Sequence, residues 1–386
     1  MKTWYADLHI HIGRTLTGKA VKITGSRNLT LPRIIEHARN EKGLDMVGII
    51  DCHAPEVLKE LEELEAQGEL EAHPDGGLMS GGLCIIPGSE LEINGEDTSG
   101  PIHVLCFFPD IRTMKEFSVW MSGYMKNINL SSQRIYVDGK ELQRKTKELG
   151  GLFIPAHVFT PFKSLYGKGV ESTLAEVFDP ELIDAVELGL SSDTEMADQI
   201  EELHKYPFLT NSDAHSLSKI AREYQEIRMD ELSFRGLEAA LKGKGNSGIA
   251  ANYGLDPLLG KYHRTVCSHC FTPVERMDLP CGSCGSLRVV KGVSDRIAEL
   301  GSNKANPSIR PLYIHHVPLE FIPGIGPRLL DRLLDHFGNE MAILHKVPEE
   351  ALAKVVPAGI ADKIIKSRNG RLAVNPGGGG KYGRSI

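Results

Sequence analysis

The stretch Tyr5–Gly13, YADLHIHIG, decides the fold class expected for this chain of 386 residues. It has the pattern of an apolar strand that carries Asp7, His9 and His11 at alternating positions. Because side chains along a strand alternate between the two faces of a sheet, all three point to one side. Burying three polar groups there is unfavourable unless something binds them. The stretch therefore predicts a metal-binding strand, with Asp7 as a group that orients one of the histidines.

The first 240 residues surround this stretch with short apolar runs that alternate with amphipathic segments, as in repeated β-α units. Helical patterns such as LPRIIEHARNEKG, IRTMKEFSVWMSGYM and DGKELQRKTKELGG separate the runs. An α/β fold is therefore expected, with a barrel or distorted barrel of parallel strands. The segment 243–257, rich in Gly and Asn, is expected as the linker that ends it. Seven runs are expected as strands, namely YADLHI, MVGIID, LCIIPGSE, IHVLCFF, LFIPAH, AVELG and FLTNSDAH.

Acidic residues and histidines lie at or just after the C-terminal end of almost every run, the edge where αβ barrels place their chemistry. Nitrogen and carboxylate ligands together suit Zn, Mn or Fe better than Mg or Ca. One metal cannot use all of them, so a cluster of two or three is expected. A single strand histidine is usually a satisfied core residue, but six together favour metal. The groups are Asp7, His9, His11, Asp51, His53, Glu90, His103, His157, Asp213 and His215.

The whole chain has an ordinary globular composition, and its length predicts two or three domains. No stretch approaches the roughly 18 apolar residues of a membrane span, and the N-terminus lacks a signal-peptide pattern, so the cytoplasm is the expected compartment. Seven cysteines, an odd number, argue against a disulfide framework. Cys52, Cys84 and Cys106 lie in apolar runs and are expected as small core residues.

The net charge of -7 conceals an asymmetry along the chain. Residues 1–259 hold 26 Lys and Arg against 40 Asp and Glu, whereas residues 260–386 hold 18 against 11. An acidic front joined to a basic back suggests that the back holds a polyanion and the front holds metals. Charge balance alone discriminates weakly, and chance is the alternative.

Two C-x-x-C pairs follow, CSHC at 267–270 and CGSC at 281–284, separated by ten residues. Cys267, Cys270, Cys281 and Cys284 have the spacing of a structural zinc site, in which four thiolates close the tetrahedron. A redox pair would need the strand-to-helix setting of a thioredoxin motif, which is missing here. Basic residues surround the pairs, and either a phosphate-binding surface or a solvated face would explain them.

The segment 319–338, LEFIPGIGPRLLDRLLDHFG, contains a Pro-Gly-Ile-Gly turn before an amphipathic helix. Gly324 and Gly326 permit a tight hairpin that presents backbone N–H groups to a phosphate oxygen, with Arg328 beside it. The segment resembles the helix-hairpin-helix motif of repair and recombination proteins, and 351–365 resembles a degenerate second half. DNA-backbone binding is favoured over a plain helix-turn-helix core element because the module is also basic.

The order H-x-H, D-C-H, a Glu after a strand, single histidines and D-x-H resembles the PHP superfamily of metal-dependent phosphoesterases. The resemblance implies a distorted (β/α)7 barrel with up to three metals. By position, the resemblance assigns the ligands of one metal to His9, His11, Glu90 and Asp213. It implies that Glu90 also bridges to a second metal held by His103 and His157. The ligands of a third metal match His53 and His215. The usual third-site histidine after H-x-H is missing, and Asp51 is a substitute for it. Asp213, Glu90 and His157 are the expected catalytic residues.

A PHP barrel (1–245), a four-cysteine zinc module (260–292) and a helix-hairpin-helix module with a Gly-rich tail (315–386), in that order, resemble the endonuclease Q family. The resemblance implies a DNA repair endonuclease that nicks 5′ to hypoxanthine, uracil or xanthine and at abasic sites. Two or three catalytic divalent metals (Zn, Mn or Mg) and one structural Zn are expected. The damaged nucleotide would be flipped into a pocket beside the metals.

Pocket residues follow His157 in the sequence. Phe159, Phe162 and Tyr166 are candidates to stack on a base and Lys163 to meet a phosphate, although loop packing explains the aromatic residues equally well. The expected partner is DNA rather than a membrane, and a sliding clamp is a further candidate. A monomer is expected because no long apolar heptad stands out.

Three alternatives stay open at this stage. A PHP phosphatase of small phosphate monoesters would leave the cysteine and hairpin modules without a role. A catalytically inactive DNA-binding PHP protein would have broken ligand sets. Exonuclease activity is compatible with the same residues. Amide hydrolysis, as in amidohydrolase barrels, is disfavoured by the basic tail.

Overall fold

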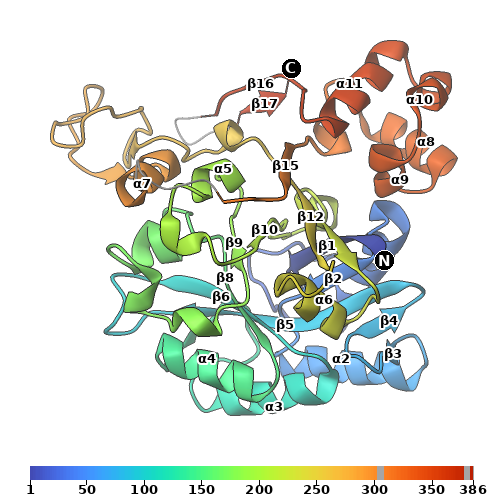
Figure 1. Cartoon of the computed structure of the whole chain (residues 1–386), viewed down its shortest axis with the longest axis horizontal. Helices are drawn as coiled ribbons and strands as arrows, with labels where there is room; N and C mark the ends of the chain where they lie inside the picture. The colour runs from blue at the N-terminus through green and yellow to red at the C-terminus, as the bar shows by residue number, and fades with distance from the viewer. Residues whose placement is uncertain (302–307, 378–382, 386) are drawn as a thin grey trace.

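The computed structural model describes residues 1–301, 308–377 and 383–385 (Figure 1). The strands are β1 (Lys2–Ile10), β2 (Met46–Ile49), β3 (Glu71–Ala72), β4 (Leu78–Ser80), β5 (Leu83–Ile93), β6 (Ile102–Phe107), β7 (Arg134–Ile135), β8 (Leu152–Pro155), β9 (Val186–Glu187), β10 (Phe208–Leu209), β11 (Tyr224–Met229), β12 (Gly248–Gly254), β13 (Val266–Cys267), β14 (Val289–Val290), β15 (Leu312–His315), β16 (Val374–Asn375) and β17 (Arg384–Ser385). The α-helices are α1 (Leu31–Glu36), α2 (Pro55–Ala66), α3 (Ile111–Ser122), α4 (Gly139–Glu148), α5 (Thr194–Ala197), α6 (Phe234–Leu241), α7 (Val293–Leu300), α8 (Pro327–Phe337), α9 (Glu340–His345), α10 (Glu349–Val355) and α11 (Ala358–Arg368).

Seven strands form a ring in the order β1-β2-β5-β6-β8-β9-β10. β9 joins β8 through the bond from the Asp184 N–H to the Phe153 carbonyl, at 3.0 Å. The ring closes where Ala214, just after β10, exchanges two hydrogen bonds of 3.1 Å with the backbone of His9 and His11. The expected distorted (β/α)7 barrel is therefore confirmed, and it brings the end of β1 beside the segment that contains Asp213.

One strand of the ring departs from the expected parallel arrangement. β6 runs antiparallel to both β5 and β8. This explains why His103 can join groups from other strand ends although it is the second residue of its own strand. An antiparallel strand brings its first residues, rather than its last, to the edge where the parallel strands end.

The prediction of a linker over residues 243–257 is wrong for Gly248–Gly254. These residues form β12, which pairs antiparallel with β11 and parallel with β15. The sheet therefore continues past residue 245, in the order β15-β12-β11-β1. The Gly and Asn content that suggested a loop belongs to a strand stabilised by neighbours on both sides.

The helical patterns of the sequence are confirmed. α1 continues into a π-helical turn (His37–Lys42) that stops at Gly43, whose φ of 75° is the left-handed conformation of a helix C-cap. α3 and α4 begin at the caps Asp110 and Asp138, whose side chains accept backbone N–H bonds. In Figure 1, α2, α3 and α4 line the lower side of the barrel.

The chain after β12 forms the two smaller modules, both above the barrel in Figure 1. The cysteine-bearing loops around β13 and β14 lie at the upper left, and helices α8 to α11 lie at the upper right. The two ends of the Gly-rich tail pair as β16 and β17. Residues 378–382 of the predicted Gly-rich tail, between these two strands, lie outside the described residues.

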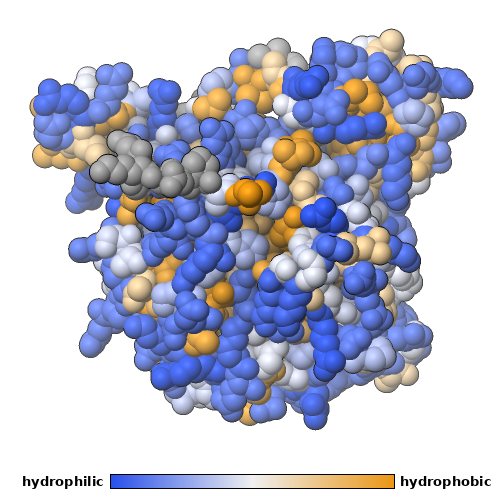
Figure 2. All heavy atoms as spheres, in the orientation of Figure 1, coloured by the Kyte–Doolittle hydropathy of each residue, from blue (hydrophilic) through white to orange (hydrophobic). Residues whose placement is uncertain are grey.

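The apolar residues gather in two buried clusters, which include Cys52, Cys84 and Cys106 as expected. Figure 2 shows mostly hydrophilic residues on the visible face, with small hydrophobic groups between them. None of the helices in the described ranges is long and apolar enough to cross a membrane.

Candidate metal centre

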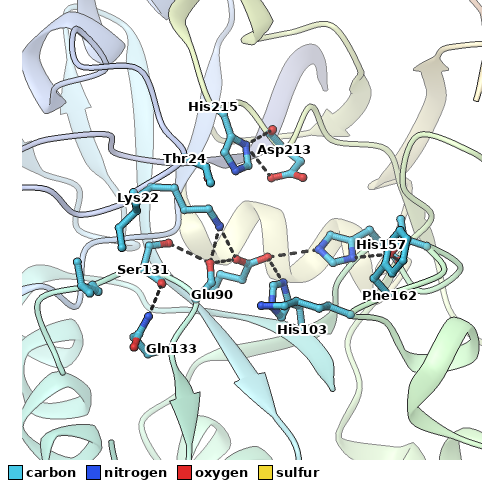
Figure 3. Close-up of a pocket in the computed structure, with 15 residues that line it drawn as sticks. Lys22, Thr24, Glu90, His103, Ser131, Gln133, His157, Phe162, Asp213 and His215 are labelled. Carbon is cyan, nitrogen blue, oxygen red and sulfur yellow. Dashed lines mark hydrogen bonds and ion pairs between the residues drawn. The ribbon is translucent and has the colours of Figure 1, made fainter. Parts of the chain in front are cut away.

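A cavity of about 430 Å³ opens at the strand ends, within the range of small-ligand sites. Figure 3 shows carboxylate, imidazole and ammonium groups that converge on Glu90. The lining residues include Lys22, Glu90, His103, Ser131, Ser132, His157, Phe162, Lys163, Asp213 and His215. The predicted residues of widely separated segments therefore share one pocket.

The first candidate ligand group comprises His9, His11 and Glu90, all buried. The Nε2 atom of His9 lies 3.5 Å from a Glu90 oxygen, and the Nε2 atom of His11 lies 3.6 Å from the other. Neither Nε2 atom has a hydrogen-bond partner among the described residues. A buried imidazole nitrogen without a partner, next to a carboxylate, fits a divalent cation.

The second group comprises Glu90, His103 and His157. The Oε1 atom of Glu90 lies 2.9 Å from Nδ1 of His103 and 3.3 Å from Nε2 of His157. Glu90 is therefore shared between two ligand groups, the position that the family resemblance gives to a bridging carboxylate.

The third group comprises His11, Asp213 and His215. The Oδ1 atom of Asp213 lies 3.3 Å from Nε2 of His11 and 3.4 Å from Nδ1 of His215. Asp213 has a φ of 46° and His157 a φ of 32°. Such left-handed backbone is uncommon for residues other than Gly and is concentrated at functional sites.

Burial alone raises the pKa of Glu90, but the nearby charges of His103 and Lys22 outweigh it and hold the pKa well below the usual carboxyl value. Asp213 behaves in the same way, since the charge of His9 outweighs burial and lowers its pKa. Both carboxylates are therefore ionised and can act as ligands.

The structure places His53 apart from these three groups. Its Nδ1 atom lies 2.9 Å from the Ser89 hydroxyl, and its Nε2 atom lies 3.3 Å from the Leu130 carbonyl. Both ring nitrogens are thus occupied by protein groups, which explains why this buried histidine does not point into the ligand cluster.

The predicted role of Asp7 is wrong. Its carboxylate accepts from the backbone N–H groups of Ser212 at 3.1 Å and Ala221 at 2.9 Å, not from a histidine ring. It therefore holds the loop that carries Asp213. Asp51 orients a histidine instead, since its Oδ2 atom lies 3.0 Å from Nδ1 of His11. Its Oδ1 atom is buried without a hydrogen-bond partner among the described residues, but Asp51 belongs to none of the candidate ligand groups found there.

Glu187 at the end of β9 was missed by the sequence analysis. Its Oε1 atom lies 2.9 Å from Nδ1 of His9, and its Oε2 atom accepts from the His157 N–H at 2.8 Å. It thus supports residues of two ligand groups. The run AVELG was identified as a strand, and the rule used for the other groups, an acid at a strand end, applies to Glu187 as well.

Two of the three candidate base-pocket residues do not fit that role. Phe159 and Tyr166 are buried and stack on each other with ring centroids 5.4 Å apart, and the Tyr166 hydroxyl donates to Glu202. Loop packing, the alternative, accounts for both. Phe162 is 49% exposed and lines the pocket. Lys163 also lines it and pairs with Glu92 at 2.8 Å.

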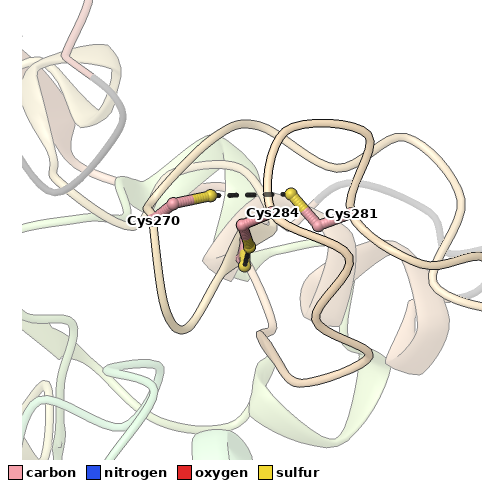
Figure 4. A group of neighbouring side chains, drawn as sticks. Cys270, Cys281 and Cys284 are labelled. Carbon is pink, nitrogen blue, oxygen red and sulfur yellow. Dashed lines mark hydrogen bonds between the residues drawn. The ribbon is translucent and has the colours of Figure 1, made fainter.

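The four cysteines of the second module come together. Figure 4 labels three of them, Cys270, Cys281 and Cys284. The Sγ atoms of Cys267 and Cys284 are 3.6 Å apart, and those of Cys270 and Cys281 are 3.5 Å apart. Tetrahedral zinc with Zn–S bonds of about 2.3 Å requires sulfur atoms about 3.8 Å apart. A hydrogen bond from the Thr272 hydroxyl lowers the pKa of Cys270 to about 6, which favours the thiolate. The four residues fit a structural zinc ion.

The predicted hairpin forms between a 3-10 turn (Leu319–Phe321) and α8. Gly324 has a φ of 101°, and a Cβ atom there would lie 2.5 Å from the side chain of Ile360 in α11. Gly326 is the N-cap of α8, followed by Pro327 and the exposed Arg328. The degenerate second half, 351–365, spans most of α10 and α11, and Ile360 packs it against the first hairpin.

One further group of potential ligands, His73, Asp75 and Glu231, lies outside the pocket. Asp75 also pairs with Arg235, and Glu231 is exposed. It shares no residue with the groups around Glu90.

No family model matches this chain. It is 56% identical over 384 residues to the uncharacterized protein YqxK of Bacillus subtilis, covering 100% of this chain and 99% of that protein. The crystal structure of the lesion-specific endonuclease PfuEndoQ from Pyrococcus furiosus superimposes with a TM-score of 0.85 and 34% identity, covering 100% of this chain and 95% of that one. A complex of Endonuclease Q with a 27-mer duplex substrate that has an abasic lesion at the active site gives a TM-score of 0.84, with 34% identity and coverage of 100% and 96%. The match therefore includes the barrel, the four-cysteine module and the helical module, and this chain belongs to the endonuclease Q family.

Proposed function

We propose that this chain is a metal-dependent DNA repair endonuclease that hydrolyses the phosphodiester 5′ to deaminated bases, namely hypoxanthine, uracil and xanthine, and at abasic sites. The observation that carries the proposal is the convergence of three ligand groups on one open pocket, with Glu90 shared by two of them. Full-length similarity to a lesion-specific endonuclease supports it.

The residues around the pocket have distinct roles in this proposal. His9, His11 and Glu90 would hold one metal, and Glu90, His103 and His157 would hold a second. Asp213 and His215 would be further ligands beside His11. A third ion at that position would be held without His53, whose ring nitrogens contact Ser89 and Leu130. Zn or Mn suits the mixture of imidazole and carboxylate better than Mg.

Two divalent metals at these positions would supply a water of lowered pKa and positive charge for the phosphoryl group. The chain itself has to orient the substrate and keep the ligands in place. Glu187 fixes the rings and backbone of the histidine ligands, whereas Phe162 stands exposed at the pocket wall, where a flipped base can stack on it.

The remaining modules bind the DNA backbone in this proposal. Gly324 and Gly326 shape a hairpin whose N–H groups face a phosphate at the start of α8, and Arg328 adds positive charge there. Lys163 at the pocket wall is a second phosphate contact. Such contacts provide affinity without reading sequence.

The test uses a 5′-labelled duplex with one deoxyinosine, incubated with the purified protein and Mn²⁺ or Mg²⁺. We expect a single nick immediately 5′ to the inosine, which product length reports. The nick should disappear with a chelator and in Asp213→Asn, because the amide removes a charged ligand. Asp75→Asn is the matched control, since it makes the same change in a His-Asp-Glu group away from the pocket.

A different product pattern would contradict the proposal. Activity on a generic phosphate monoester without any nick would identify a small-molecule phosphatase instead. Progressive shortening from an end would identify an exonuclease.

A further inference from the structure

Lys22 projects into the pocket from a segment that carries none of the predicted ligands. The segment between Gly13 and Leu29 loops away from β1 and returns to it. The Lys22 N–H donates to the Ile12 carbonyl at 2.9 Å, and the Ser131 N–H donates to the Val21 carbonyl at 2.9 Å. These two backbone bonds fix the start of the Lys22 side chain next to His11 and to the pocket wall.

The ammonium group of Lys22 lies between Glu90 and Ser132. Its Nζ atom is 3.3 Å from Oε2 of Glu90 and 2.6 Å from the Ser132 hydroxyl, as Figure 3 shows for the Glu90 contact. The side chain is 14% exposed. An ammonium has three donors, and the described residues accept two of them. The third is available to a ligand in the pocket.

Ser132 provides an independent indication of function at this position. Its φ of 53° is left-handed, which is uncommon for a serine and is typical of functional sites. Its hydroxyl also donates to Glu90, so one residue contacts both the ammonium and the shared carboxylate. The backbone of Ser132 is thus held in a conformation that directs its hydroxyl to Lys22.

The other lysine of the pocket wall, Lys163, differs from Lys22 in its partner and in its exposure. Lys163 is paired with Glu92 at 2.8 Å, and its side chain is half exposed. Lys22 is the better enclosed of the two and the one whose ammonium group contacts a candidate metal ligand. Because its side chain is only 14% exposed, water screens its charge less than that of Lys163, and the charge acts more strongly on an anion.

We propose that Lys22, held in place by Ser132, is a catalytic residue that donates a hydrogen bond to a nonbridging oxygen of the phosphodiester being cleaved. This inference rests on the proposed function. In the reaction the oxygen of water bonds to phosphorus, the bond from phosphorus to the 3′ oxygen breaks, and that oxygen takes a proton. Lys22 neither gives nor takes a proton; it stabilises negative charge on the phosphoryl group.

The test measures single-turnover cleavage of the deoxyinosine duplex, together with bound metal by elemental analysis. Lys22→Met should lower the rate by about 100-fold, as removal of one oxyanion donor does, while metal content and duplex binding stay at the wild-type level. Lys22→Arg keeps the charge and should recover part of the rate. Lys19→Met is the matched control, because Lys19 is in the same loop, is 74% exposed and pairs with Glu56 outside the pocket. It should cleave at the wild-type rate.

Sulfur substitution at the scissile phosphate locates the contact. Sulfur in place of the oxygen that Lys22 contacts should slow the wild type but should not slow Lys22→Met further, because the contact is already gone. The inference would be overturned if the sulfur substitution and Lys22→Met slowed cleavage additively for both phosphorothioate diastereomers of the duplex. A wild-type cleavage rate in Lys22→Met would overturn it as well. Loss of metal from Lys22→Met would show that Lys22 acts through Glu90 and not on the phosphate. No nick by the wild-type protein would overturn the proposed function itself, and the inference with it.

Discussion

Glu187 is a buried carboxylate that contacts three polar groups, two of which belong to the candidate metal ligands His9 and His157. It contacts Nδ1 of His9, the backbone N–H of His157 and the side-chain amide of Asn211, at 2.8 to 2.9 Å. Burial alone raises its pKa, but the charge of His9 outweighs this and lowers the pKa below the usual carboxyl value. An ionised Glu187 therefore accepts from all three groups and leaves Nε2 of His9 to face Glu90.

Glu187→Gln should lower metal affinity by roughly 10- to 100-fold, as loss of a group that orients a ligand does. A glutamine has one acceptor oxygen in place of two, so at least one of the three donors meets an NH2 group. Titration of the metal-free protein with Mn²⁺ in a calorimeter measures the change.

Glu223→Gln is the matched control, because Glu223 is also buried but accepts from the Leu255 N–H and touches no candidate ligand. Its metal affinity should equal that of the wild type. Equal affinities for both variants would contradict the role given to Glu187.

Sequence reasoning found the residues whose position follows from strand periodicity and failed where a role depends on tertiary contacts. The structure brings together four residues that lie in or just after the predicted strand runs, namely His9, His11, Glu90 and Asp213. Lys22 has no such signal, because a lysine in a polar loop looks solvated until the loop is seen to return to β1. Phe159 and Tyr166 look like Phe162 in the sequence, and only burial separates them.

At the scale of the element, patterns of apolar residues predicted seven strands of the barrel, but the parallel direction expected for all of them is wrong for β6. Nothing in the run IHVLCFF shows that β6 is antiparallel, because the partner strand decides direction. β12 was missed for a related reason. Its Gly and Asn residues have low strand propensity, and pairing with β11 and β15 outweighs that preference.

The hairpin before α8 depends on Gly324. Gly324→Ala should lower the free energy of unfolding by roughly 1–3 kcal/mol, because a φ of 101° is strained for any side chain and the new methyl group would lie 2.5 Å from Ile360. Affinity for an undamaged duplex should fall as well, since the hairpin has to move. Urea denaturation and fluorescence anisotropy measure the two effects.

Gly359→Ala tests whether any added methyl group in this module has the same result. Gly359 lies in the first turn of α11, and a Cβ atom there meets nothing within 4 Å. Alanine should therefore stabilise the helix by roughly 0.5–1 kcal/mol and leave DNA affinity unchanged. A loss of DNA affinity in both variants would show that the effect is not specific to the hairpin at Gly324.

At the scale of the molecule, the helical module is joined to the barrel by a continuous apolar cluster that extends from Ile10 to Leu333 and Ile364. Polar contacts accompany it. Lys42 in the barrel and Glu340 in α9 form a buried ion pair of 2.8 Å. These residues are 298 positions apart, so no local pattern in the sequence could have predicted the contact. The module that resembles a DNA-binding tail is thus fixed in place relative to the pocket.

Two buried histidines make this junction sensitive to acid. Burial lowers the pKa of His345 to about 3 and that of His316 to about 4. Between pH 6.5 and these values the unfolded chain binds protons that the folded chain does not. The free energy of unfolding should therefore fall as the pH drops below 6.5, by up to about 1.4 kcal/mol per pH unit for each histidine.

A double variant isolates the contribution of His345, whose ring stacks on Tyr5 and whose Nε2 atom accepts from the Tyr224 hydroxyl at 2.8 Å. Tyr224→Phe with His345→Phe removes both polar partners and keeps two aromatic rings, a change that is often nearly neutral. Stability near pH 7.5 should stay close to that of the wild type, while the slope below pH 6.5 decreases by up to about 1.4 kcal/mol per pH unit. Urea denaturation of both metal-free proteins across pH 4.5–7.5 gives the two slopes, and because the metal ligands are common to both, the difference reports on His345. Identical slopes would mean that His345 is protonated in the folded protein and that the junction does not exclude its charge.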